Sequence, residues 1–120
     1  MNHGKYIGCV IAESLADQCM INGFEVFKIH ISSEPDDRWH MYWVKVNESD
    51  LILIQNNFLD GGWYAHFANS VSDEGVVVFK EKMFRMKKSD SSTWTGAIEY
   101  GRSIGIPEEQ LDFEFESLKG

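Results

Sequence analysis

The sequence predicts an α+β domain with a mostly antiparallel sheet of about five or six strands and two main helices packed on one face. Short segments rich in β-branched and aromatic residues, with alternating polarity, recur along the chain. Two longer segments carry apolar residues at helical spacing. The connections contain turn residues and no long linker, so residues 1–120 are expected to form one domain. A ferredoxin-like βαββαβ core with an added hairpin and a C-terminal helix is the specific candidate.

The strands are expected to be joined by short turns. In the second expected strand, Phe27, Ile29 and Ile31 alternate with polar residues, which predicts a half-buried strand. The turn "SEPDD" should join it to the third strand as an antiparallel hairpin. The expected strands cover residues 5–12, 24–32, 38–46 and 63–69, followed by a hairpin over 76–88.

The first main helix is expected to follow Asn47 or Ser49, either of which can cap its start. Its buried face should consist of Leu51, Ile54 and Phe58, and Gly61 should end it. A shorter helix or irregular loop is expected between the first two strands, ending at Gly23.

The second main helix is expected after the caps offered by residues 90–92. Gly105 suits the left-handed position that follows a helix, and Pro107 prevents continuation. The inner face is predicted from residues at i, i+3, i+4 and i+7, namely Trp94, Ala97, Ile98 and Gly101.

The third expected strand is apolar on both faces, which is the main functional lead. One face carries Trp39, Met41 and Trp43, and the other carries His40, Tyr42, Val44 and Val46. Two indoles and a thioether expose on the order of 400 Å², and covering that area is worth about 10 kcal/mol before association costs. Three alternatives could account for this apolar face. The final helix or the "PEEQLDFEF" tail could pack over it, a second copy could cover it in a homodimer, or it could line a ligand groove.

A second set of candidate residues lies on the fourth expected strand. Trp63, Tyr64 and His66, together with His40, could line the pocket of a small enzyme or ligand-binding protein, with an unknown small-molecule ligand. His66 is the candidate for acid–base work. His30, His40 and His66 each fall on an expected strand and could converge, but their spacing is not that of a metal motif. We therefore expect no metal and no cofactor.

The charge distribution disfavours a nucleic-acid or membrane partner. The formal net charge is −8, whereas phosphate binding needs a positive face. A basic segment over 80–88 offers a weaker nucleic-acid hypothesis, through Lys80, Lys82, Arg85, Lys87 and Lys88. No segment approaches the ~20 apolar residues that span a bilayer, and residues 1–17 do not read as a signal peptide. Cys9 and Cys19 form no CxxC motif, which favours reduced thiols in the cytoplasm.

Several phrases resemble a group of small prokaryotic proteins of unassigned function. They are "KYIGCVIAESL", "WYAHF", "VVVFKEKMFRM" and "EYGRSIGIPEEQLDF", and the likeness covers most of the chain. It implies a complete, single, cytosolic domain of microbial origin, and it implies no activity, cofactor or catalytic residue. From the residues we expect a binding or interaction module that self-associates through the aromatic sheet face. The alternative is the small enzyme or ligand-binding protein.

Overall fold

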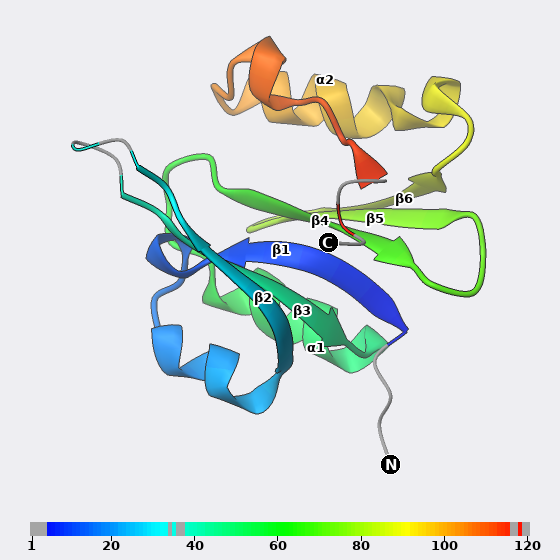
Figure 1. The fold of residues 1–120 in the computed structure, drawn as a ribbon. Coiled ribbons are helices and arrows are strands. Elements are labelled where there is room, and N and C mark those ends of the chain that lie inside the picture. The colour runs from blue at the N-terminus through cyan, green and yellow to red at the C-terminus, as the bar shows by residue number, and fades with distance from the viewer. Residues whose placement is uncertain (1–4, 34, 36–37, 116–117, 119–120) are drawn as a thin grey trace.

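The computed structural model describes residues 5–33, 35, 38–115 and 118, and its centre is a six-stranded antiparallel sheet in the order β2-β3-β1-β4-β5-β6 (Figure 1). The predicted α+β fold class and the number of strands are confirmed. Residues 34, 36 and 37 of the predicted turn lie outside the described residues. The strands are β1 (Tyr6–Ile11), β2 (Glu25–Ile31), β3 (His40–Val46), β4 (Tyr64–Asn69), β5 (Glu74–Phe79) and β6 (Met83–Lys87).

The helices are two α-helices and four short 3-10 segments within the described residues. None of them is long and apolar enough to cross a membrane. In chain order they are η1 (Ala12–Ser14), η2 (Gln18–Gly23), α1 (Glu48–Asn57), η3 (Ser91–Trp94), α2 (Thr95–Ser103) and η4 (Glu108–Gln110).

The two α-helices pack on opposite faces of the sheet, so the prediction that both cover one face is wrong (Figure 1). The alternation along β5 shows the division. Val76 and Val78 pack in a core with α1, whereas Val77 and Phe79 pack in a second core with α2. An amphipathic helix has a buried stripe, but its sequence pattern does not say which face of a sheet that stripe meets. We call the two sides of the sheet the α1 face and the α2 face.

The first four strands have the connectivity of the ferredoxin-like candidate. β1 and β2 are joined through η1 and η2, with β3 inserted between them in the sheet. β3 and β4 are joined through α1, with β1 inserted between them. This split β-α-β order is compatible with a ferredoxin-like core in which 3-10 segments stand in place of the first helix. β5, β6 and α2 are then the addition.

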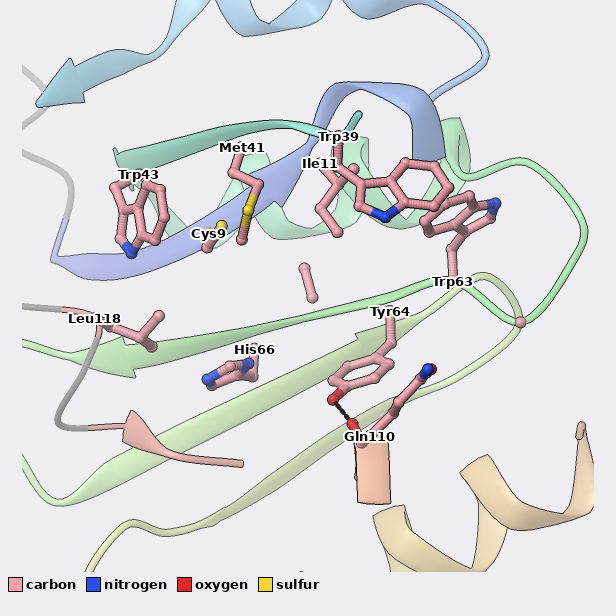
Figure 2. A pocket seen from close by; sticks show the side chains of 12 residues that line it. Cys9, Ile11, Trp39, Met41, Trp43, Trp63, Tyr64, His66, Gln110 and Leu118 are labelled. Atoms are coloured by element: carbon pink, nitrogen blue, oxygen red, sulfur yellow. Dashed lines mark hydrogen bonds between the residues drawn. The ribbon is translucent and has the colours of Figure 1, made fainter. Parts of the chain in front are cut away.

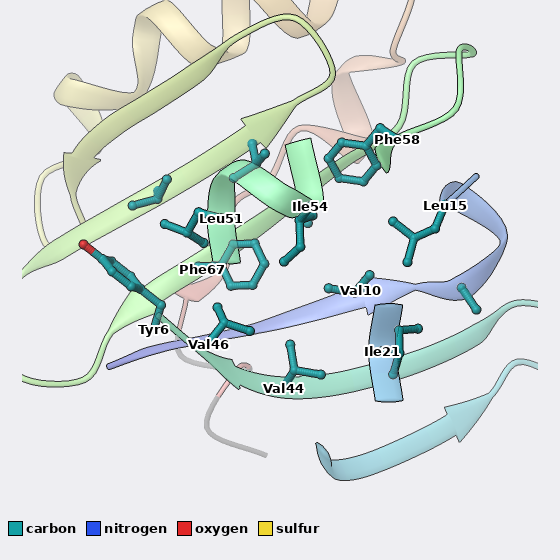
Figure 3. Packing of buried hydrophobic residues seen from close by; sticks show 14 residues of the cluster. Tyr6, Val10, Leu15, Ile21, Val44, Val46, Leu51, Ile54, Phe58 and Phe67 are labelled. Atoms are coloured by element: carbon teal, nitrogen blue, oxygen red, sulfur yellow. The ribbon is translucent and has the colours of Figure 1, made fainter. Parts of the chain in front are cut away.

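The α1 face holds the larger core (Figure 3). Leu51 and Ile54 are fully buried on α1, as the helical spacing predicted. Phe58 is buried too, but α1 ends at Asn57, so Phe58 is an extended residue after the helix and the prediction that Gly61 ends the helix is wrong. The start of α1 is fixed because the backbone N–H of Asn47 donates to Oδ2 of Asp50 at 2.9 Å. Side chains from β1, β3 and β4 meet this helix, including Val10, Val44, Val46 and Phe67.

The α2 face is covered by α2 together with the C-terminal segment, which we define as residues 111–115 and 118 (Figure 1). The left-handed Gly105, with φ of 94°, ends the α2 region as predicted. The chain then returns over the sheet, and its apolar side chains are buried. They are Leu111, Phe113, Phe115 and Leu118.

Strand β2 differs from its prediction, because it is an edge strand and almost all of it is exposed. A bulge between Val26 and Lys28 leaves Phe27 without a partner on β3. Beyond the bulge Ile29 lies opposite Tyr42, and Ile31 lies opposite His40. Their exposed fractions are 59% and 52%. The alternating pattern of a half-buried strand does not distinguish a central strand from an edge strand.

Candidate functional site

A cavity of 420 Å³ lies on the α2 face, between strands β1 and β3 on one side and the C-terminal segment on the other (Figure 2). α2 covers the half of this face formed by β4 to β6, and the cavity occupies part of the other half. We call this cavity the aromatic groove. Its lining residues are Cys9, Ile11, Trp39, Met41, Trp43, Gly62, Trp63, Tyr64, Ala65, His66, Gln110 and Leu118.

The groove brings together all the sequence-predicted site residues except one. Trp39, Met41, Trp43, Trp63, Tyr64 and His66 line it. His40 does not, and its grouping with the others is wrong. Its backbone N–H donates to Oε1 of Glu13 at 2.8 Å, and its Nδ1 lies 2.6 Å from Oε2 of the same carboxylate. Successive residues of a strand point to opposite faces, so His40 cannot share a face with Trp39 and Met41.

One end of the groove is built by Trp39 and Trp63. Their rings meet edge to face, with centroids 5.2 Å apart and planes at 82°. Trp63 reaches this position because the turn before β4 contains two glycines in the left-handed region, Gly61 and Gly62. Trp39 is therefore partly covered within the chain, by the indole that directly precedes β4.

The other end of the groove is built around Trp43, which is half-buried. Trp43 lies opposite Cys9 across the β1–β3 pair, and Met41 lies opposite Ile11. The ammonium of Lys28 lies 4.5 Å from the Trp43 ring centroid. At ~3.3 Å per residue, Trp39 and Trp43 stand about 13 Å apart along the strand. The groove is therefore elongated.

The opposite wall is held by contacts between β4 and the chain that follows α2. The Tyr64 hydroxyl donates to the carbonyl oxygen of Gln110. Nε2 of His66 lies 3.3 Å from the carbonyl oxygen of Glu114. Because a carbonyl oxygen only accepts, this contact assigns the imidazole proton to Nε2. The Phe113 ring packs against both Tyr64 and His66, at centroid distances of 5.6 and 6.3 Å.

The titratable groups of the groove are uncharged at neutral pH. Burial raises the pKa of the Cys9 thiol to about 12 and that of the Tyr64 hydroxyl to about 12. Burial also lowers the pKa of His66, which keeps the imidazole neutral. No Asp, Glu, Lys or Arg is among the described residues that line the groove. Its wall is therefore apolar and aromatic, without formal charge.

Sequence reasoning missed four side chains that complete the groove. Cys9 and Ile11 come from β1, whose alternation with the buried Val10 would have placed them on the α2 face. Gln110 and Leu118 come from the chain that follows α2. The alternation of Leu111, Phe113 and Phe115 with acids indicated an extended segment with one buried face, although not where that segment would lie.

The other candidate sites do not assemble within the described part of the chain. His30 is exposed on the edge strand, His40 pairs with Glu13 on the α1 face, and His66 contacts the C-terminal segment. No group of three or more His, Cys, Asp or Glu residues has the proximity of a metal site among the residues described.

The predicted basic segment consists mainly of side chains that already have partners. Lys80 pairs with Asp60 at 2.9 Å. The Arg85 guanidinium bridges Glu48 and Glu74, at 2.7 and 2.8 Å. Lys88 Nζ donates to the carbonyl oxygen of Asn69, and the Lys82 ammonium lies over the Phe84 ring. These contacts do not form the continuous positive face that phosphate binding needs.

No family model, no curated protein and no solved structure matches this chain. Function is therefore inferred from the residues of the aromatic groove.

Proposed function

We propose that this protein is a binding module whose aromatic groove accepts an elongated, uncharged and largely apolar molecule. The observation that carries the proposal is the wall itself, in which three tryptophans and a tyrosine line one cavity with no charged side chain among the described lining residues. The volume of 420 Å³ falls in the range of small-molecule sites. A charged ligand group would lose its hydration in this groove, where no described lining residue carries a charge to replace it. The Lys28 ammonium lies over the Trp43 ring at one end and is not a lining residue.

The pKa values favour binding over catalysis. A nucleophilic cysteine needs a thiolate, but burial raises the pKa of Cys9 to about 12. Tyr64 is held protonated in the same way and already donates its proton to Gln110. His66 has a lowered pKa, and Nε2 is engaged by Glu114, which leaves Nδ1 as its one proton acceptor. Among the described residues that line the groove, the small-enzyme alternative therefore depends on His66.

The proposal is tested with two dyes that share one scaffold. N-phenyl-1-naphthylamine is neutral, and 8-anilinonaphthalene-1-sulfonate adds a sulfonate to the same ring system. Titration followed by dye emission and by tryptophan quenching should show that the neutral dye binds and that the sulfonate binds more weakly. Equal affinity for the two dyes, or no binding of the neutral dye, would refute the proposal.

A groove variant and a matched surface variant locate the dye. Trp43→Ala removes one end of the groove, and losing about 60 Å² of buried contact at ~25 cal/mol per Å² should weaken binding about tenfold. Val71→Ala is the control, because Val71 is 80% exposed and does not line the groove. Binding unchanged by Trp43→Ala would place the dye elsewhere.

Self-association through the aromatic sheet face is the second candidate, and the half-buried Met41 and Trp43 favour it. A homodimer formed by this face would close the groove. Affinity for the neutral dye should then fall as the protein concentration rises, whereas a monomeric binding module keeps one affinity at every concentration.

We also propose a cytoplasmic location, supported by two cysteines that are not joined in a disulfide.

A further inference from the structure

The free edge of the sheet at β2 carries three of the large apolar side chains that the described residues leave exposed. Phe27, Ile29 and Ile31 have exposed fractions of 36%, 59% and 52%. In the described part of the chain β2 is bonded to β3 on one side only, so the other side of this edge strand presents its backbone N–H and C=O groups outward. We propose that β2 pairs antiparallel with β2 of a second copy of this chain, which joins two sheets into one. This interface is separate from the aromatic groove and does not depend on its ligand.

The opposite edge of the sheet shows how an edge strand is normally protected. β6 carries Arg85 and Lys87 as exposed charged side chains. The backbone of Lys87 is also satisfied by side chains, since its N–H donates to Oγ1 of Thr93 and its carbonyl accepts from Nε1 of Trp94. β2 also carries two charged side chains, Glu25 and Lys28, but its exposed positions 29 and 31 are isoleucines. The β2 edge can therefore pair with a strand of another chain more readily than the β6 edge can.

A second copy fits β2 because the strand is complementary to itself in one register. The bulge at Val26 and Lys28 limits regular pairing to the part of the strand that follows it. A two-fold axis at His30 places Ile29 opposite Ile31 of the second copy, twice, and clusters four isoleucines on the α1 face. An axis at Lys28 would instead set two ammonium groups against each other.

Local charge does not oppose this pairing, although the net charge of each chain is −8. Glu25 forms an ion pair with Lys45 at 3.4 Å, and Lys28 lies over the Trp43 ring. Lys28 lies opposite Trp43 in the β2–β3 pair, so it shares the α2 face with that residue and not the face of the isoleucines. Ile29 and Ile31 are therefore free of charged neighbours on their own strand and face.

The expected dimer is reversible, because a short ladder and four isoleucines bury less than the ~800 Å² per partner of a stable interface. Sedimentation velocity from low micromolar to several hundred micromolar protein should show a monomer–dimer equilibrium. The double variant I29K/I31K should remain monomeric over this range, with the circular dichroism of the wild type. Ile52→Lys is the control, because Ile52 is 53% exposed on α1, away from the edge, and this variant should still dimerise.

Cross-linking tests the register independently of any loss of stability. In a Cys19→Ser background, which removes the exposed thiol, His30→Cys should form a disulfide-linked dimer under mild oxidation. Lys28→Cys should not, because the two copies of residue 28 lie apart when the axis passes through residue 30.

Three results would overturn the proposal. The first is a wild-type protein that is monomeric at every concentration. The second is a dimer that survives I29K/I31K but dissociates with Trp43→Ala, because that would place the interface on the aromatic groove. The third is equal cross-linking of the variants at residues 28 and 30, which would indicate random collision.

Discussion

Replacing Gly75 with alanine tests how the C-terminal segment is held on the sheet. An alanine Cβ at this position of β5 would lie 2.5 Å from Cζ of Phe115 and 2.7 Å from Cε1. The ring has little room to move, because it packs edge to face on His66 and Trp94 at centroid distances of 5.4 and 5.5 Å. Overpacking of this kind costs about 1–3 kcal/mol. We expect Gly75→Ala to lower the free energy of unfolding by about 2 kcal/mol.

Urea unfolding followed by tryptophan fluorescence measures the loss. Gly23→Ala is the matched control, because its new Cβ meets nothing within 4 Å and its φ is outside the left-handed region. That variant should be neutral or stabilised by about 0.4–1 kcal/mol. Adding Phe115→Leu to Gly75→Ala should recover part of the loss, since the two changes act on one contact. The reasoning is refuted if Gly75→Ala unfolds at the same urea concentration as Gly23→Ala, or if the losses of the double variant simply add.

Three further predictions concern residues in and behind the aromatic groove. Gly8→Ala should destabilise more than Gly75→Ala, because its Cβ would lie 2.6 Å from the backbone oxygen of His66, which cannot swing aside; urea unfolding of the two variants side by side checks the order. Burial lowers the folded-state pKa of His66 below the unfolded value of about 6.5, so the unfolded chain takes up the proton first. The free energy of unfolding should therefore be highest above that pH and decline as the pH falls below it. The decline should be smaller in His66→Gln, and an identical pH dependence in the variant would contradict this. A chromogenic thiol reagent should modify the exposed Cys19 quickly and the half-buried Cys9 slowly, since the pKa of Cys9 is raised to about 12. Equal rates would contradict the raised pKa of Cys9.

The fold class could be predicted because alternation and helical spacing are local signals. The inner face of α1, with Leu51 and Ile54, followed directly from its spacing. The face of the sheet that α2 covers did not follow from helical spacing, although one feature of the sequence indicated it. A strand that is apolar on both faces needs cover on both sides, and β3 carries Val44 toward one face and Trp43 toward the other. That pattern argues for a helix on each face of the sheet.

The candidate site was predicted in part, for the same reason. Trp39 and Trp43 share a face by alternation within one strand, and Tyr64 and His66 do so within another. That β1 would lie between these two strands was not visible, because strand order depends on contacts between residues distant in sequence. Cys9 lines the groove because β1 lies between β3 and β4. His40 was included wrongly because it was grouped by chemistry, whereas the pleat sends it to the other side.

The position of β1 has a consequence for how the chain is made. Within this sheet β1 is synthesised before the other strands, yet both of its neighbours, β3 and β4, are synthesised much later. Until β3 and β4 have been synthesised, the apolar strand β1 has no strand to pair with. In contrast, β4, β5 and β6 are consecutive in sequence and can pair with one another as a local meander. Nascent chains arrested before β4 should therefore be the form of this protein most dependent on chaperones.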